Sequence, residues 1–404
     1  MLVRLRFVGA PLTDDEGALL TAAQVWTRGG VPYRDVWFDG PQGVLVLYRL
    51  WTPGSVRWLG VFAAVFLVIA VASVASSIAR TLAVRRSDLV PSPDRTAAIA
   101  ALVTAVVAVS PGWLGFAAAP VLIGLTFAMA ALALSIHATA GRLGGWAGIV
   151  AGVWCGAAVS LDLAAARVAL MVPLWLALAA VGRRHRRNAV ATLRLVGVGA
   201  LVVVAPLAMH AVRLGVSPWW DAVVVARSHR DDPQQWLLLV PVLAIVAGLV
   251  IGRLQRASWR AAAVAVVLVP TAWSFGAQVF RPDSRIATGG TGNGAAHAES
   301  VGRWIAANSD PGDRVLALCS GAATYAYAER DPALPYLDAA DLRQAAPSPM
   351  LVASVLSGDD RPEWVAVFDL PAECGSPTLV GVLADFYVEE TVIEGVRLLR
   401  AVGS

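Results

Sequence analysis

The chain contains a series of apolar stretches that are each close to the length needed to cross a lipid bilayer. Of its 404 residues, 57% are hydrophobic and 15% are charged, whereas about a quarter of the residues in a soluble domain are charged. A helical span needs about 17–25 mostly apolar residues. About eight stretches approach this length, near residues 57–79, 96–110, 119–137, 144–160, 161–181, 189–209, 236–252 and 260–280. The sequence therefore predicts a polytopic α-helical membrane protein.

The distribution of arginine predicts how these helices are oriented. All 32 residues of the Lys and Arg class are Arg, and the Arg-rich connections follow the first, third, fifth and seventh stretches. Cytoplasmic connections carry such an excess of positive charge. We therefore expect four segments on the outer face of a bacterial plasma membrane: residues 1–55, 111–118, 210–235 and 281–404. The absence of Lys excludes a P-loop nucleotide site, and arginines scattered between spans do not indicate nucleic acid as a partner.

The sequence changes character after the last apolar stretch. Residues 1–56 form a first external loop with short amphipathic helices, and residues 57–280 form the predicted bundle. Residues 281–296 are rich in Gly and Ala and predict a flexible linker. Residues 297–404 predict a small extracytoplasmic α/β domain, because helical and strand patterns alternate along them. The expected helices lie near 297–308, 348–357 and 377–386, the strands at 314–319 and 364–369, and a final hairpin at 387–393 and 396–401.

Two cysteines of this domain, Cys319 and Cys374, come at or after the ends of two predicted strands. If the strands are parallel neighbours, both cysteines lie at the same edge of the sheet. A disulfide, which needs Cα atoms about 4.4–6.8 Å apart, would persist outside the cytoplasm. Two unpaired, partly buried thiols are the alternative.

The first external loop concentrates acidic residues. Thr13 and Glu16 have the spacing of a helix capping box, and Gly29 suits the end of that helix. These structural roles do not require Asp15, Asp35 or Asp39 close to the predicted membrane surface. The residues alone leave a structural and a functional role for this loop equally open.

Three short motifs follow one another through the loop. They are Asp15-Glu16-Gly17, Gly30-Val31-Pro32-Tyr33-Arg34-Asp35 and Gly40-Pro41-Gln42-Gly43, and Arg57 opens the next apolar stretch. This arrangement resembles the first external loop of the GT-C superfamily of membrane glycosyltransferases. Within it, the bacterial branch akin to protein O-mannosyltransferases and lipid A aminoarabinose transferases is the most similar. The resemblance implies a GT-C-like helical bundle.

The chain departs from the pattern of that branch in three places. The family usually has a membrane span before the acidic loop, and the residues before Pro11 are too few to cross. Either the start of the chain is misassigned or the family's first helix is missing. Many relatives carry an acidic residue in the second external loop, whereas residues 111–120 contain none. In the third motif, Gln42 replaces a common Pro.

The resemblance implies a sugar transfer from a polyprenyl-phosphate donor to an acceptor hydroxyl at the outer membrane face, with inversion at the anomeric carbon. The acceptor would belong to a glycan, a lipid or a protein. Asp15 is expected to act as the general base, and Glu16 to position it. The candidate substrate-binding residues are Tyr33, Asp35, Asp39, Arg57, Asp162, Arg167, Arg227, His229 and Arg230.

Charge chemistry selects several of these candidates. The guanidinium of Arg pairs well with phosphate, which favours Arg57 and the segment that begins at Arg227. The alternative for that segment is a solvated loop neutralised by its neighbouring aspartates. Asp162 and Arg167 lie at and inside an apolar stretch, where a charge costs about 2.5–3.5 kcal/mol and usually has a function. The alternative for Asp162 is a helix cap.

No cofactor is expected, although a divalent metal is left open. The histidines do not show the spacing of metal ligands, and no metal-binding residues are predicted. Two other functions compete with the transferase. The departures from the family pattern suggest a catalytically inactive relative. A transporter or flippase would show paired interrupted helices in two halves, and the sequence lacks this pairing.

Overall fold

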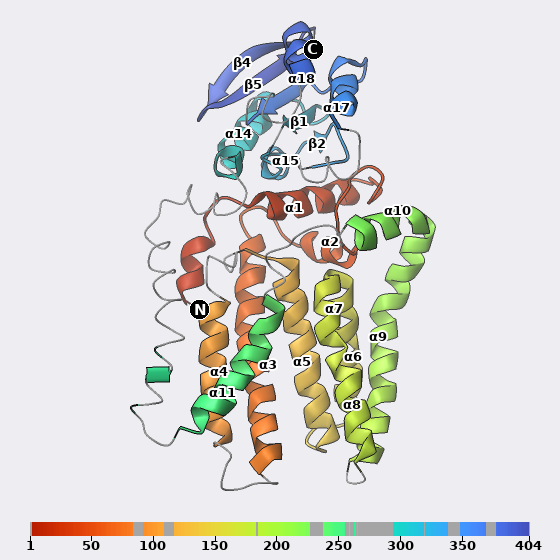
Figure 1. Ribbon diagram of the computed structural model, residues 1–404. Coiled ribbons are helices and arrows are strands. Elements are labelled where there is room, and N and C mark those ends of the chain that lie inside the picture. The colour runs from red at the N-terminus through yellow and green to blue at the C-terminus, as the bar shows by residue number, and fades with distance from the viewer. Residues whose placement is uncertain are drawn as a thin grey trace.

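The computed structural model describes most of the chain in three stacked parts (Figure 1). The described residues are 2–83, 92–108, 117–182, 185–226, 237–254, 258, 262–263, 265, 294–318, 320–337, 348–368 and 377–403. A bundle of long helices forms one end, a layer of short helices crosses it, and an α/β domain lies on top of that layer.

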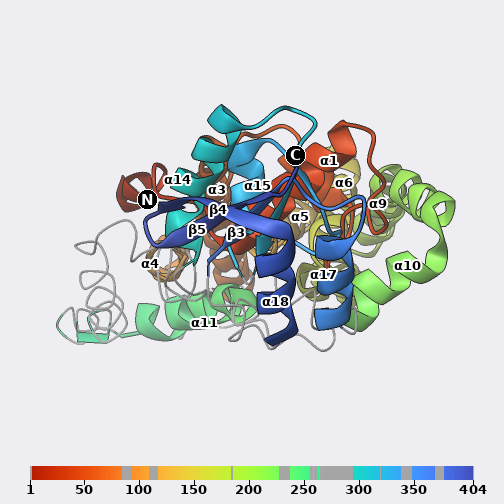
Figure 2. The ribbon, with the colours of Figure 1, turned by 90° about the horizontal axis from the view of Figure 1, so that it is seen from above.

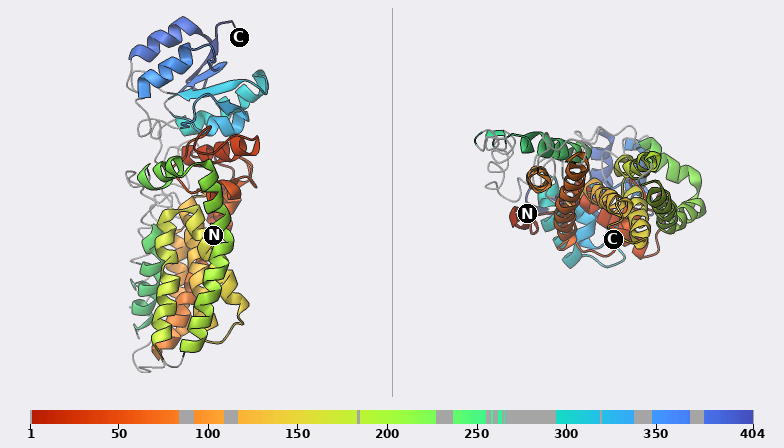
Figure 3. Two further views of the ribbon diagram at one scale, coloured as in Figure 1. Left: turned by 90° about the vertical axis from the view of Figure 1, so that its right-hand side faces the viewer. Right: turned by 90° about the horizontal axis from the view of Figure 1, so that it is seen from below.

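The helices of the bundle pack in a row, which Figure 3 shows from below. α11 packs on α4, α4 on α3, α3 on α5, α5 on α6, and α6 on α9. Their bounds are α3 (Val56–Ala83), α4 (Pro93–Val107), α5 (Pro120–Thr139), α6 (Trp146–Leu161), α7 (Leu163–Ala169), α8 (Met171–Val181), α9 (Arg186–Leu214) and α11 (Val240–Gly252).

Four helical segments are long and apolar enough to cross a membrane: α3, α5, α7 together with α8, and α9. α6 and the helical segment Leu237–Gly252 are apolar but shorter. Each of the first seven predicted stretches contains a helix, whereas the eighth, 260–280, lies almost wholly outside the described residues. The outer surface of the helices exposes large apolar side chains such as Phe66, Leu178 and Leu201. Lipid suits such a surface better than water, and the number of crossings stays a prediction.

α6 and α9 approach each other closely because glycines line their contact. A Cβ on Gly152 would overlap the carbonyl oxygen of Val196, and one on Gly199 would overlap that of Ile149. Small residues let helix backbones meet in this way inside membranes. The glycine contacts extend along α6 from Gly148 to Gly156, which lies against Ala200 and Val203 of α9.

The crossing layer contains the predicted acidic loop. It includes η1 (Leu2–Phe7), α1 (Asp14–Thr27), α2 (Gly43–Tyr48), α10 (Val216–Trp220) and the π-helical segment η3 (Asp221–Ala226). The capping box of Thr13 and Glu16 is confirmed, since each side chain bonds the backbone N–H of the other residue. Gly29 has φ +101° directly after the helix, which a residue with a Cβ adopts with strain.

The α/β domain contains a five-stranded sheet in the order β2-β1-β3-β5-β4. β1 (Arg314–Leu318) pairs in parallel with β2 (Asp331–Pro332) and with β3 (Trp364–Val367). β5 (Val396–Ala401) pairs antiparallel with β3 and with β4 (Tyr387–Ile393). The predicted hairpin, helices and strands are confirmed to within a few residues, whereas β2 and α15 (Ala323–Ala328) were not predicted.

Helices cover both faces of the sheet (Figure 2). α17 (Ser348–Ser357) and α18 (Pro377–Phe386) pack on the face that carries Leu316 and Val365. α14 (Gly294–Asn308) and α15 cover the opposite face, where Val315 and Ala366 point. Cys319 and Cys374 lie outside the described residues, so their disulfide stays a prediction.

The α/β domain contacts α1 through α15 and the segment after it. A Cβ on Gly17 would overlap the backbone of Ala323. The N–H of Leu12 donates to the hydroxyl of Tyr327 at 3.2 Å, and the Arg28 guanidinium pairs with Asp331 at 2.5 Å. The acidic helix is therefore held between the bundle and the α/β domain.

Candidate functional site

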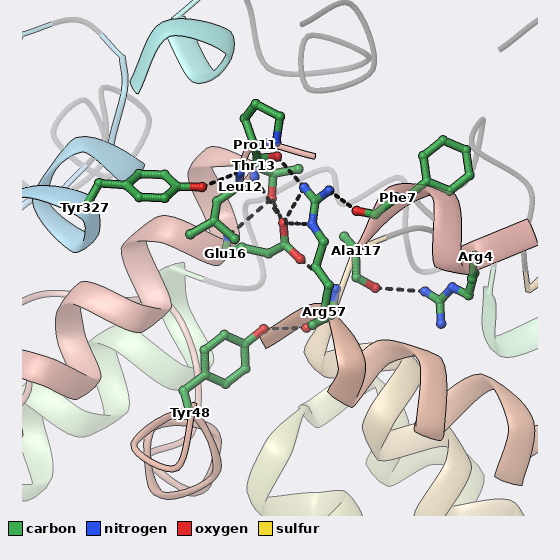
Figure 4. Close-up of polar contacts among 11 residues, drawn as sticks. Arg4, Phe7, Pro11, Leu12, Thr13, Glu16, Tyr48, Arg57, Ala117 and Tyr327 are labelled. Atoms are coloured by element: carbon green, nitrogen blue, oxygen red, sulfur yellow. Dashed lines mark hydrogen bonds and ion pairs between the residues drawn. The ribbon is translucent and has the colours of Figure 1, made fainter. Parts of the chain in front are cut away.

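A buried ion pair joins the acidic helix to the start of the bundle (Figure 4). The side chains of Glu16 and Arg57 are each 2% exposed, and Nη2 of Arg57 lies 3.1 Å from Oε2 of Glu16. Arg57 also donates to the carbonyl oxygens of Phe7 and Pro11. Oε1 of Glu16 accepts the N–H of Ala118 at 2.8 Å. The pair thus fastens four segments of chain at one point.

The protonation of Glu16 follows from these contacts. Burial by itself would raise the pKa of the carboxyl group, but the charge of Arg57 and the hydrogen bonds from Ala118 and Thr13 outweigh it and lower the pKa. Glu16 is therefore a carboxylate at neutral pH. A carboxylate with this many donors is a poor proton acceptor, so the geometry favours a positioning role over proton transfer.

Two further buried polar residues complete this network, and neither was predicted. Arg4 donates to the carbonyl oxygens of Gly60 and Ala117, and the hydroxyl of Tyr48 donates to that of Ala118. An Arg between the apolar residues Val3 and Leu5 was the available signal for Arg4. Tyr48 lies in an apolar run that gave no signal.

Asp15 is half-buried in the first turn of α1, next to Glu16. Its charge acts on the nearby phenol of Tyr48. Burial is the main reason that the pKa of Tyr48 is raised, and the charges of Glu16 and Asp15 raise it further. Asp15 and Glu16 are therefore neighbours in different environments. Asp15 is partly accessible, whereas the carboxylate of Glu16 is enclosed.

The structure places the second and third motifs in a compact turn. Tyr33 has φ +67° and is buried against Phe38, with ring centroids 4.8 Å apart, and its hydroxyl donates to the carbonyl oxygen of Gly40 at 2.7 Å. Asp35 is exposed, and its hydrogen bond with Arg34 lowers the pKa of its carboxyl group against the opposing effect of burial. Asp39 is half-buried. Tyr33 thus shapes the turn that carries the two aspartates.

The remaining predicted residues lie in the bundle or outside the described part of the chain. Asp162 is buried and caps α7, with Oδ1 accepting the N–H of Ala164 at 2.6 Å and that of Ala165 at 3.2 Å. Asp162 thus has the role of a helix cap, which was the alternative to a substrate-binding role. Arg167 is exposed one turn further along the apolar helix. Arg227, His229 and Arg230 lie outside the described residues, directly after η3 in the sequence.

An apolar cavity of about 310 Å³ lies between the acidic loop and the bundle. Its walls come from the loop turn, from the junction of α6 and α7, and from α9 and α10. The lining residues are Pro41, Gln42, Gly43, Val159, Ser160, Leu163, Val204, Leu207, Ala208, Ala211, Val212, Val216 and Trp219. The cavity has the size and the mostly apolar lining that are typical of a small-molecule site.

No group of three or more His, Cys, Asp and Glu side chains that could hold a metal ion occurs within the described part of the chain. The expectation that the protein works without a cofactor stays a prediction.

Comparison with known proteins connects this geometry to one fold. No protein-family model matches the sequence, and no curated protein matches it. A crystal structure of ArnT from Cupriavidus metallidurans bound to undecaprenyl phosphate has a TM-score of 0.64 and 13% identity, and the match covers 100% of this chain and 96% of the ArnT chain. The apo structure of that protein has a TM-score of 0.64 and 14% identity, with 98% and 95% covered. The chain therefore has the fold of ArnT, and its predicted resemblance to the GT-C glycosyltransferases is confirmed at the level of the fold.

Proposed function

We propose that this protein is an integral membrane glycosyltransferase that moves a sugar from a polyprenyl-phosphate donor to an acceptor hydroxyl at the outer membrane face. The cavity between the turn of the acidic loop and the bundle carries this proposal. It is apolar, as a prenyl chain requires, and its lining includes Pro41, Gln42 and Gly43 from the third motif of the acidic loop. The ArnT structure of the same fold was obtained with undecaprenyl phosphate.

In the proposed reaction, the half-buried Asp15 accepts the proton of the acceptor hydroxyl while the oxygen attacks the anomeric carbon. The bond from that carbon to the phosphate oxygen breaks, and the polyprenyl phosphate leaves with the electron pair. Attack opposite the leaving group inverts the anomeric centre. Asp15 suits this role better than Glu16, because the Glu16 carboxylate is enclosed by donors on both oxygens.

Glu16 and Arg57 position the base instead of contacting substrate. Their ion pair fixes the first turn of α1, where Asp15 lies, against the start of α3. Arg57 donates to two backbone carbonyls as well as to Glu16, so a phosphate would have to displace these partners. We propose Arg227, His229 and Arg230 as phosphate contacts, since their segment follows α10, and Val216 and Trp219 of α10 line the cavity.

A transfer assay with purified protein in nanodiscs tests the donor class. We expect label to move to an acceptor from polyprenyl-phosphate sugars and not from nucleotide sugars. Transfer from nucleotide sugars alone would contradict the proposal. Absence of transfer from every polyprenyl-phosphate sugar, by protein that binds undecaprenyl phosphate, would support the inactive-relative alternative.

A further inference from the structure

The cavity lies beyond the glycine contacts between α6 and α9, toward the acidic loop. Both helices run toward the acidic loop, and Gly152 and Gly199 bring their backbones together at one level. Further along, Val159 of α6 and Val204 and Leu207 of α9 line the cavity. The glycine contacts therefore fix one end of the pair, and the separation at the other end needs a different restraint.

That restraint comes from Gln42, whose side chain is 1% exposed. Its Nε2 donates to the carbonyl oxygen of Leu207 at 2.6 Å and lies 3.5 Å from Nδ1 of His210. Its Oε1 lies 3.4 Å from the hydroxyl of Tyr33, whose single proton points mainly to the carbonyl oxygen of Gly40 at 2.7 Å. One amide thus connects the turn of the acidic loop to α9 at the wall of the cavity.

Gln42 contacts α9 directly after the position where the helix is weakest. Pro206 lies inside α9; it has no N–H to donate to the carbonyl of Val202, and such a proline commonly bends a helix. The side chain of Met209 on this segment is exposed. Residues 207–214 therefore form a segment with a hinge at one end and the Gln42 amide as its polar restraint.

We propose that Gln42 is a positioning residue that clasps α9 beyond Pro206 and thereby sets the width of the cavity for the lipid chain of the donor. The ligand class rests on the proposed function, whereas the clasp rests on the contacts of Gln42 alone. Without the amide, residues 207–214 move relative to the acidic loop, and the cavity loses its fixed width.

Hydrogen–deuterium exchange of the full chain in nanodiscs tests the clasp without any assay of activity. Gln42→Leu keeps the volume of the side chain and removes both hydrogen bonds. We expect the amides of residues 207–214 to exchange about tenfold faster, as loss of about 1.4 kcal/mol of local stability implies. The amides of 189–199, held by the glycine contacts, should keep their rates. Gln24→Leu on α1 is the matched control, and Gln42→Met repeats the test if Gln42→Leu does not fold.

Two readouts separate the clasp from the proposed function. Unchanged exchange of residues 207–214 in the Gln42 variants would overturn the clasp. For the donor, we expect the KM of a polyprenyl-phosphate sugar to rise about tenfold in Gln42→Leu with kcat unchanged, the pattern of lost substrate binding. A fall in kcat with unchanged KM would overturn the positioning role. Undecaprenyl phosphate should slow the exchange of residues 207–214 in the parent protein. If exchange is faster in the Gln42 variants but the lipid has no effect on the parent protein, the clasp stands and the donor class is wrong.

Discussion

At the scale of single residues, the account depends on two neighbouring carboxylates in different surroundings. Glu16 has donors on both oxygens and no exposed surface of consequence, whereas Asp15 is partly accessible. A general base must be reachable by the proton it accepts, which favours Asp15 as the proposed base and a structural task for Glu16.

Glu16→Gln should therefore unfold more easily, because it leaves the guanidinium of Arg57 buried without its counter-charge. Removing one partner of a buried pair costs about 3–5 kcal/mol. Thermal unfolding measures the loss, and the double variant Glu16→Gln with Arg57→Met should recover part of it. Additive losses in the double variant would show that the two side chains are not coupled.

The same pair predicts how stability depends on pH. The folded-state pKa of Glu16 lies below its ordinary value of 4.5, so the carboxylate stabilises the fold fully above that value. The contribution is lost as pH falls through the lower, folded-state pKa. The difference in unfolding temperature between the parent and Glu16→Gln should therefore shrink as the pH is lowered from neutral to pH ~3. A constant difference across this window would contradict the assignment.

At the scale of elements, α9 offers a paired test of the close contact with α6. A Cβ on Gly199 would overlap the carbonyl oxygen of Ile149, whereas one on Gly197 meets nothing within 4 Å. Gly199→Ala should destabilise the protein by about 1–3 kcal/mol through overpacking. Gly197→Ala should be neutral or stabilising, since Ala favours helix. Equal unfolding temperatures for the two variants would exclude this packing.

The elements also show how far sequence reasoning extends. Apolar length and strand alternation located the helices of the bundle and the hairpin β4–β5, because these signals are local. β2 and α15 are short and take their structure from packing against β1 and α14, so the sequence carried little local signal for them. The capping box was visible for the same local reason. The partnership of Glu16 with Arg57 was not, because 41 residues separate them.

At the scale of the whole molecule, the α/β domain holds α1 against the bundle. Gly17 is the point of closest approach, where a Cβ would overlap Ala323. Gly17→Ala should loosen the domain, so that Leu12 loses its bond to Tyr327 and its amide exchanges faster. Gly381→Ala, on a helix with nothing within 4 Å of the added Cβ, is the control. If exchange at Leu12 is the same in both variants, the domain does not restrain α1 in this way.

The most direct test of the central claim is the single-turnover rate of sugar transfer by Asp15→Asn. The account predicts a fall of about 10²–10⁴-fold, the usual effect of losing a general base, with the unfolding temperature unchanged and Asp35→Asn close to the parent rate. Full activity in Asp15→Asn with a large loss in Asp35→Asn would show that another carboxylate is the base. Full activity in both variants would contradict the proposed mechanism.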